Sequence, residues 1–306
     1  MILLCGVPSE RPLAMVRDAL DEIGAPYLSF NQRHVATYRL QWTIKRGTLA
    51  GSLEMDGTSH DLATIRAAYI RLMDDRILPE LRAEPEGSPA RIHARALHDS
   101  LYRWLEHAPG RMVNRAAPQG SNGSKPYQAQ LIAQHGFLVP DTLITNDPDE
   151  VLAFQRQHGT IIYKSISAVR SIVQTLTEAD LPRLDHIGWC PVQFQALVPG
   201  HDIRVHVVGD AVHATEIVSD CIDYRYARKL GGSAELRAIT LPPEIAARCV
   251  ALAAGLALPF SGIDLKRTPA GEYYCFEVNP SPAFSYFEAN TGQPIARAVA
   301  EYLAGA

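Results

Sequence analysis

The sequence predicts an α/β lobe followed by a mixed α and β region with antiparallel hairpins, and three observations lead to this fold class. Residues 1–30 read as strand, helix and strand, with an apolar run at each end and a helix from Pro12 between them. The Pro, Gly, Ser and Asn cluster in "MVNRAAPQGSNGSKPY" is typical of a boundary. Beyond it, "DIRVHVVGDAVHATEIV" reads as two strands joined by a tight turn.

Composition excludes several classes of protein. The chain has 306 residues, 47% of them hydrophobic and 20% charged, which is globular and leaves room for more than one core. A net charge of −4 gives no broad cationic surface, so neither nucleic acid nor membrane is expected as a partner. The five cysteines are odd in number and form no C-x-x-C pair, which argues against disulfides or zinc. Without a secretory or membrane-spanning run, we expect a cytoplasmic protein.

The first lobe offers little chemistry. Its helix has Leu13, Val16, Leu20 and Ile23 on one face and ends at Gly24. The loop "CGVPSE" before it matches neither a dinucleotide fingerprint nor a Walker loop, so no phosphate site is expected there.

Further strands are expected at Tyr38–Ile44 and Ala67–Arg71. Arg71 and Arg76 can bind a substrate carboxylate, although a charged run of this kind is more often a solvated surface.

The second region begins near Asn114. Ser124 is a candidate cap for a helix from Lys125 to His135, and Pro148 opens another helix that ends at Gly159. Two short strands, Thr160–Lys164 and Ser171–Leu176, flank "SISAVR".

The segment "SGIDLKRTPAGEYYCFEVNPSP" predicts a hairpin with its turn at Pro269, Ala270 and Gly271. A turn centred between Ala270 and Gly271 places Asp264 opposite Glu277, with Asn279 on the same face. Paired carboxylates on a buried face repel each other unless a cation neutralises them.

Oxygen ligands without His or Cys suit Mg²⁺ or Mn²⁺ carrying a phosphate. The alternative is that Asp264 points to solvent and Glu277 pairs with Lys266.

Other residues are those that a phosphate-bound metal needs. Lys125 begins a helix and Lys164 ends a strand, and an ammonium at either place can meet a polyphosphate. In "CPVQFQALVPGHDIRVHVVGD", a strand edge can bind a purine base while Phe194 covers the face of the base. Arg204 shares the inward face of a strand with His206 and can neutralise an acyl phosphate.

The order of these motifs resembles a known family. Lys125, Lys164, "QFQ", "DIRV", "DYR", "GIDL" and "FEVNPSP" together resemble the ATP-grasp ligases of the RimK type, and especially the graspetide (microviridin-type) peptide maturases. The resemblance implies a pre-ATP-grasp domain over residues 1–113 and an ATP-grasp domain over 114–306, the latter with a central lobe (114–190) and a C-terminal lobe (191–306).

The resemblance also implies a role for each matching residue. Lys125 and Lys164 would contact the phosphates of ATP, Gln193 and Phe194 the adenine, and Asp202 the ribose side. Arg204 and Arg225 would hold the transferred phosphoryl group and the acyl phosphate. Asp264, Glu277 and Asn279 would ligate Mg²⁺, and Ser281 would lie beside the acceptor.

Two departures stand out: the loop after Lys164 contains no glycine, and "NPSP" replaces the more usual "NPSG".

The implied activity is that of an ADP-forming ligase, in which ATP converts a carboxylate to an acyl phosphate that an amine or hydroxyl attacks. The substrate would be a ribosomal precursor peptide that gains ester or amide crosslinks. A ligase for a small carboxylate, amino acid or dipeptide is the alternative, and a non-catalytic ATP-grasp-like module is a third. The complete set of metal and phosphate residues favours an enzyme. The number of subunits is left open, a homodimer included.

Overall fold

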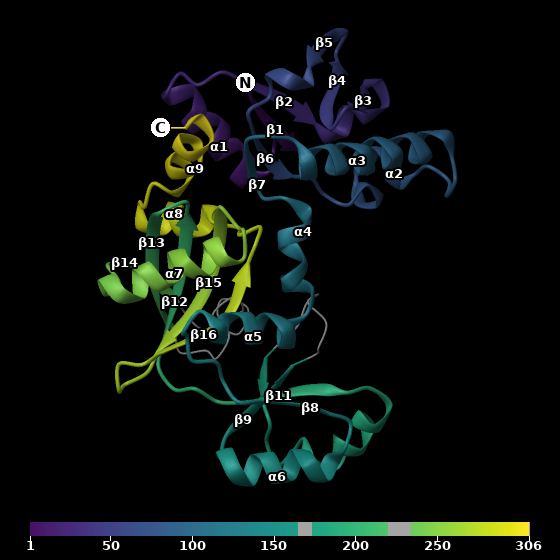
Figure 1. The fold of residues 1–306 in the computed structure, drawn as a ribbon. Coiled ribbons are helices and arrows are strands. Elements are labelled where there is room, and N and C mark those ends of the chain that lie inside the picture. The colour runs from purple at the N-terminus through teal and green to yellow at the C-terminus, as the bar shows by residue number, and fades with distance from the viewer. Residues whose placement is uncertain (165–172, 220–233, 306) are drawn as a thin grey trace.

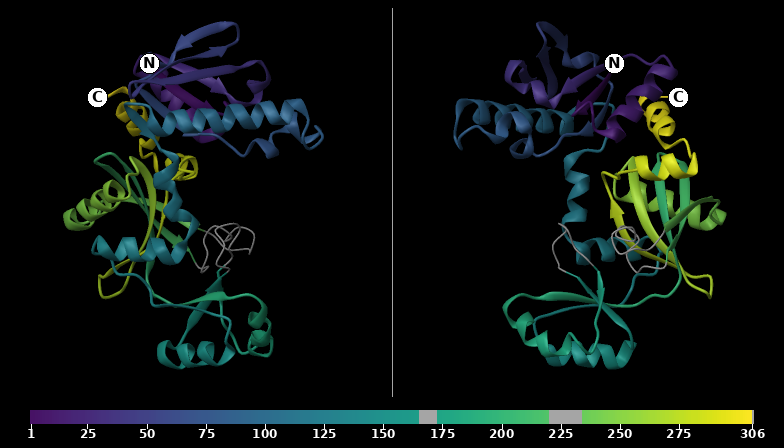
Figure 2. Two further views of the ribbon diagram at one scale, coloured as in Figure 1. Left: turned by 45° about the vertical axis from the view of Figure 1, so that its right-hand side comes forward. Right: turned by 180° about the vertical axis from the view of Figure 1, so that it is seen from behind.

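The structure is a computed structural model and describes residues 1–164, 173–219 and 234–305. Figure 1 shows an N-terminal lobe at the top, a central lobe at the bottom and a C-terminal lobe between them, and Figure 2 shows the same three parts from two other sides. The fold is mixed α/β with antiparallel sheets after a parallel first sheet, as predicted. Within the described ranges, every helix is too short or too polar to cross a bilayer.

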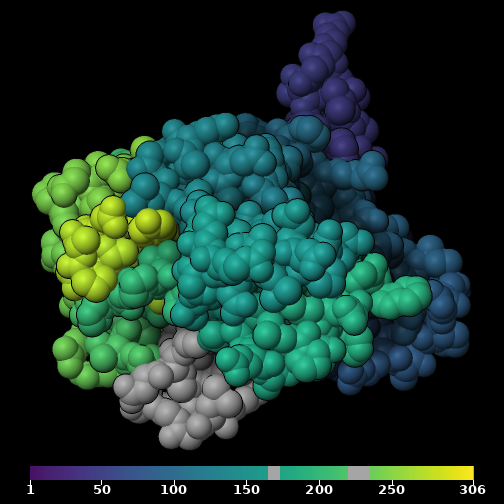
Figure 3. Space-filling model, turned by 90° about the horizontal axis from the view of Figure 1, so that it is seen from below, coloured from purple at the N-terminus to yellow at the C-terminus, as the bar shows by residue number. Residues whose placement is uncertain are grey.

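The N-terminal lobe is built on the parallel sheet β2-β1-β6-β7. Its elements are β1 (Ile2–Gly6), α1 (Arg11–Glu22), β2 (Tyr27–Asn31), β3 (Arg39–Lys45), β4 (Thr48–Met55), β5 (Thr58–Asp61), β6 (Ala67–Arg71), α2 (Pro79–Arg82), α3 (Pro89–His107) and β7 (Arg111–Val113). The strands expected at 1–7, 27–30 and 67–71 are confirmed. A second sheet, β3-β4-β5, projects from the lobe as the finger at the upper right of Figure 3.

The two faces of β1 bury alternate residues in different cores. Leu3 and Cys5 pack with α3, whereas Ile2 and Leu4 lie in a core shared with α1 and with α9 (Ile295–Ala304). The last helix of the described chain therefore covers the first lobe.

The central lobe carries the antiparallel sheet β10-β9-β11-β8. Its elements are β8 (Thr142–Thr145), α6 (Pro148–His158), β9 (Ile161–Lys164), β10 (Gln174–Thr175), the 3₁₀ helix η5 (Leu181–Trp189) and β11 (Val192–Ala196). The expected division after residue 190 falls just before β11, whose hydrogen bonds to β8 and β9 make it a strand of the central sheet. The central sheet thus runs to Ala196. The boundary between residues 113 and 114 stays a prediction.

The C-terminal lobe contains the antiparallel sheet β14-β13-β12-β15-β16. Its strands and helices are β12 (His201–Val208), β13 (Ala211–Ser219), β14 (Ala234–Ile239), α7 (Pro243–Gly255), β15 (Phe260–Arg267), β16 (Tyr273–Asn279) and α8 (Ser285–Thr291). Two short segments lead into it from the N-terminal lobe, α4 (Ala116–Gln119) and α5 (Lys125–Gln134). The expected start of α5 at Lys125 is confirmed, although the Ser124 side chain makes no capping hydrogen bond.

The β15–β16 hairpin has the register expected at its polar end. Asp264 faces Glu277, and Gly262 faces Asn279. Closer to the turn the register shifts by one, because Phe276 is an extra residue without a partner on β15. The bulge lets Cys275 and Val278 both enter the core while Phe276 and Glu277 both face the space between the lobes.

Candidate active site

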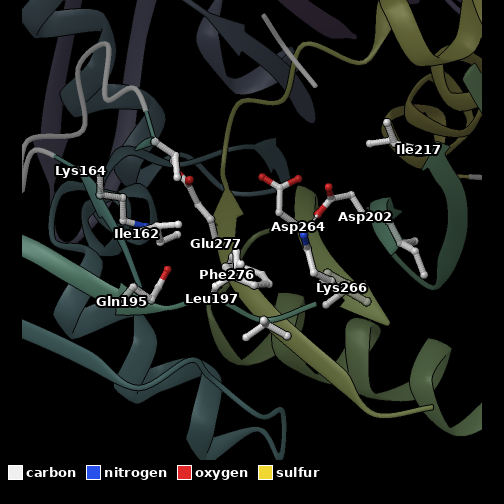
Figure 4. A pocket seen from close by; sticks show the side chains of 14 residues that line it. Ile162, Lys164, Gln195, Leu197, Asp202, Ile217, Asp264, Lys266, Phe276 and Glu277 are labelled. Atoms are coloured by element: carbon white, nitrogen blue, oxygen red, sulfur yellow. Dashed lines mark ion pairs between the residues drawn. The ribbon is translucent and has the colours of Figure 1, made fainter. Parts of the chain in front are cut away.

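A pocket lies between the central sheet and the C-terminal sheet (Figure 4). One part of its lining is apolar and comes from both lobes, with Ile162, Leu197, Val198, Ile203 and Leu265. The other part is charged, with Lys164, Asp202, Asp264, Lys266 and Glu277. The pocket can therefore bind a ligand that carries a flat apolar group next to a charged group.

A second cavity adjoins the first on the side of α5. It shares Lys164, Gln195 and Phe276 with the first pocket, and Lys125 and Gln193 also line it. Of the residues expected at the site, Lys125, Lys164, Gln193, Asp202, Asp264 and Glu277 are thus brought together around one cleft.

Each of the two facing carboxylates is neutralised by a cation from another element. Arg204 of β12 donates a hydrogen bond from Nη1 to Asp264 Oδ1 at 2.7 Å, and Lys125 Nζ lies 3.0 Å from Glu277 Oε2. Lys266 pairs with Asp202 instead, at 3.2 Å. The alternative in which Asp264 points to solvent and Glu277 pairs with Lys266 is therefore wrong.

The predicted metal ligands differ in their present partners. Asn279 accepts a hydrogen bond on Oδ1 from the Ser281 backbone N–H at 2.9 Å, while Asp264 and Glu277 bind the two cations. Among residues 1–164, 173–219 and 234–305, no group of three His, Cys, Asp or Glu side chains is placed to hold a metal.

The predicted ligands are two carboxylates, of Asp264 and Glu277, and one amide, of Asn279. Mg²⁺ is usually held by one or two carboxylates together with substrate phosphates, so this donor set fits Mg²⁺ arriving with a nucleotide.

Arg204 is buried beneath the cleft, with 6% of its surface exposed. Its guanidinium carbon lies 5.8 Å from the centre of the Phe287 ring. His206, two residues along the same face of β12, is fully buried, and burial followed by the charge of Arg204 lowers the pKa of its imidazole well below the usual value. A neutral ring next to Arg204 adds no repulsion to the guanidinium.

Phe194 does not lie where the sequence suggested. Its side chain is 1% exposed and packs with Val151 and Ile161 in the core of the central lobe, on the face of the sheet away from the cleft. The cleft face of β11 carries Gln193 and Gln195. Alternation along β11 explains the correction, because the residue between two cleft-facing glutamines must point the other way.

Phe276 and Lys266 line the cleft but were not expected there. A strictly alternating strand would place Phe276 on the face opposite Glu277, so only the bulge reveals it. Arg225 and the glycine-free loop at 165–172 lie outside the described residues.

The N-terminal lobe also reaches the site. Arg71 at the end of β6 forms an ion pair with Glu10 and donates from Nη1 to Ser281 Oγ at 3.1 Å. Its side chain is 10% exposed, so Arg71 is a largely buried contact between lobes and not a solvated surface group. Arg76 instead pairs with Asp74 and is exposed.

Comparison with known proteins agrees with this geometry. The model of the RimK-like ATP-grasp domain matches residues 123–303. A protein of Photobacterium profundum named "Probable alpha-L-glutamate ligase" is 30% identical over 216 residues, which cover 67% of this chain and 70% of the relative.

Solved structures resemble the whole chain. The ATP-grasp ligase PsnB complexed with minimal precursor is 27% identical, with a TM-score of 0.78 over 99% of this chain and 97% of PsnB. A RiPP-associated ATP-grasp ligase of Chryseobacterium gregarium, in complex with ADP and a leader and core peptide, has a TM-score of 0.81 at 21% identity, over 99% of this chain and 96% of that one. The second likeness shows the fold.

Proposed function

Because this chain belongs to the RimK-like ATP-grasp family and is an ATP-grasp ligase, we propose that it joins a side-chain carboxylate to an amine or hydroxyl of a precursor peptide through an acyl phosphate. The observation that carries the proposal is the cleft in which Asp264 and Glu277 face each other between Arg204 and Lys125. Four charges from four elements meet beside an apolar pocket, which suits a nucleotide polyphosphate and its base.

ATP and Mg²⁺ are the cofactors of ATP-grasp ligases. In the proposal, Asp264, Glu277 and Asn279 hold the metal, with Mn²⁺ as a substitute. The bound metal supplies positive charge at the phosphates. Lys125 and Lys164 bind phosphate oxygens, and Arg225 would join Arg204 at the acyl phosphate.

The base would lie among the apolar residues Ile162, Leu197 and Phe276, with Gln193 in the adjoining cavity and Asp202 on the ribose side.

The chemistry proceeds in two balanced steps. A substrate carboxylate oxygen attacks the γ-phosphorus of ATP, the bond to the ADP oxygen breaks, and an acyl phosphate forms. The amine or hydroxyl then attacks the acyl carbon, loses its proton, and phosphate leaves. Arg204 would face the charge that develops on the transferred group, so its lasting positive charge and fixed position are what this step needs.

A peptide substrate is supported by PsnB, whose structure holds a minimal precursor at 27% identity to this chain. A peptide can use contacts remote from the reacting groups to hold them in attack geometry. The glutamate-ligase names of relatives such as that of Photobacterium profundum favour a second candidate, the addition of a free amino acid to a carboxylate.

The metal assignment is tested by Glu277→Gln, which removes one anionic ligand with little change of shape. We expect a melting temperature close to that of the wild type and a loss of ADP formation of about a hundredfold or more. ADP release at the wild-type rate by this well-folded variant would overturn the assignment.

The substrate is tested by mass spectrometry. The substrate to try is a short Thr- and Glu-rich peptide, to be sought among the products of the neighbouring genes. With ATP, Mg²⁺ and this peptide, each crosslink should remove one water, about 18 Da, because condensation follows acyl phosphate formation. Efficient phosphate release with free amino acids, and a precursor of unchanged mass, would favour the second candidate instead.

A further inference from the structure

We propose that Gly262 positions the Arg204 guanidinium for phosphoryl transfer by leaving open the space into which it folds. This inference rests on the proposed function and concerns how that site is built. Gly262 lies on β15, opposite His206 in the ladder with β12 and two residues before Asp264.

The space above Gly262 is occupied by the guanidinium itself. A Cβ built on Gly262 would lie 2.6 Å from Arg204 Cζ and 2.8 Å from Pro282 Cβ. Real side-chain atoms do not approach this closely, so any residue with a Cβ must displace Arg204, Pro282 or both. The backbone of β15 at this position is extended and carries no left-handed strain, and the requirement for glycine therefore comes from the close approach.

Gly262, Phe287 and Asp264 surround the Arg204 guanidinium, and this space is called the guanidinium seat below. Phe287 and Asp264 fix the direction in which the guanidinium points. The Phe287 ring covers one side at 5.8 Å, and Asp264 Oδ1 accepts a hydrogen bond from Nη1 at 2.7 Å. His206 contacts the same Phe287 ring, with centroids 5.1 Å apart, so the ring is itself held. Moving Arg204 away from Gly262 would also break its bond to Asp264, one of the proposed metal ligands.

The test is a double-mutant cycle of Gly262→Ala with Arg204→Lys, a variant that keeps the charge but lacks the planar guanidinium. Gly262→Ala alone is expected to lower kcat about a hundredfold, while calorimetry gives an ATP dissociation constant within about threefold of the wild type. In the Arg204→Lys background, the same substitution should lower kcat by less than about threefold, because the group that it displaces is absent.

Gly188→Ala is the matched control. A Cβ there meets no atom within 4 Å, and kcat should not change. If Gly262→Ala does not fold, Phe287→Leu replaces it in the cycle, because it removes the ring beside the guanidinium without adding volume. We then expect Phe287→Leu to lower kcat in the wild-type background and to leave kcat nearly unchanged in the Arg204→Lys background.

Three results would overturn the proposal. An equal loss in both backgrounds would mean that the added methyl acts through Pro282. Wild-type kcat in Gly262→Ala would mean that the seat is not needed, although the metal and peptide assignments would stand. Wild-type kcat in Arg204→Lys would show that the guanidinium is not needed for the chemistry, and it would remove that part of the proposed function too.

Discussion

Phe276 is the bulge residue of the β15–β16 hairpin, and the regular pairing of the two strands does not predict which face of the sheet it occupies. It lies on the boundary of the two adjoining cavities, and its ring is half-buried without belonging to a core cluster. We therefore expect Phe276→Ala to weaken ATP binding about tenfold, through lost contact with the base, while unfolding changes little. Calorimetry and urea denaturation measure the two effects. Phe154→Ala in the central lobe is the control, because Phe154 packs on His158 outside the cleft, and there stability should fall while affinity stays. The opposite pattern in the two variants would remove Phe276 from the base pocket. Phe194 and Phe276 show how far single residues can be predicted. Phe194 lies between two glutamines and Phe276 between Cys275 and Glu277, and only the pairing of each strand decides which ring faces the cleft.

At the scale of elements, α5 is joined to β16 by the Lys125–Glu277 ion pair and by the side chain of Gln128. Gln128 is 2% exposed, accepts a hydrogen bond from the Val278 N–H at 2.9 Å, and donates one to the Val278 carbonyl at 2.8 Å. Gln128→Leu leaves two buried backbone groups without partners, so we expect the free energy of unfolding to fall by about 2–3 kcal/mol, with an unchanged urea m-value. A loss below about 0.5 kcal/mol would mean that water or another group satisfies Val278 in the variant. The hairpin and its turn could be predicted from the Pro-Ala-Gly chemistry, but the turn alone gives the wrong register next to it: Leu265 faces Cys275, and Asp264 faces Glu277 only because the bulge intervenes. The bulge could not be predicted, since one extra residue leaves no mark on the continuous apolar and aromatic run from Tyr273 to Phe276. The Gln128 bond could not be predicted either, because it joins residues that are distant in the chain.

The whole molecule depends on a contact between the first lobe and the last. Arg71 holds Glu10 within the N-terminal lobe and Ser281 beside the proposed metal ligand Asn279. Arg71→Met should cost about 3 kcal/mol of stability, because it leaves the carboxylate of Glu10 poorly solvated and unpaired. Adding Glu10→Gln should restore most of that stability in urea denaturation, whereas ligase activity should stay low in the double variant because Ser281 has still lost its donor. Activity that returns together with stability would reduce Arg71 to a structural ion pair. The contact of Arg71 with Ser281 could not be predicted from the sequence, because no local pattern indicates which distant residue a largely buried arginine will meet.

The shared core of β1, α1 and α9 has a consequence for how the protein is made. One face of the first sheet is covered partly by Ile295, Val299 and Leu303, residues that a ribosome adds after every strand described here. During synthesis the N-terminal lobe can bury Leu3 and Cys5 against α3, and Ile2 and Leu4 against α1, but the core that α1 shares with α9 is complete only after α9 has emerged. Until then the growing chain presents part of this apolar surface, and the lobe that contacts Ser281 completes its packing only after the C-terminal lobe has been made.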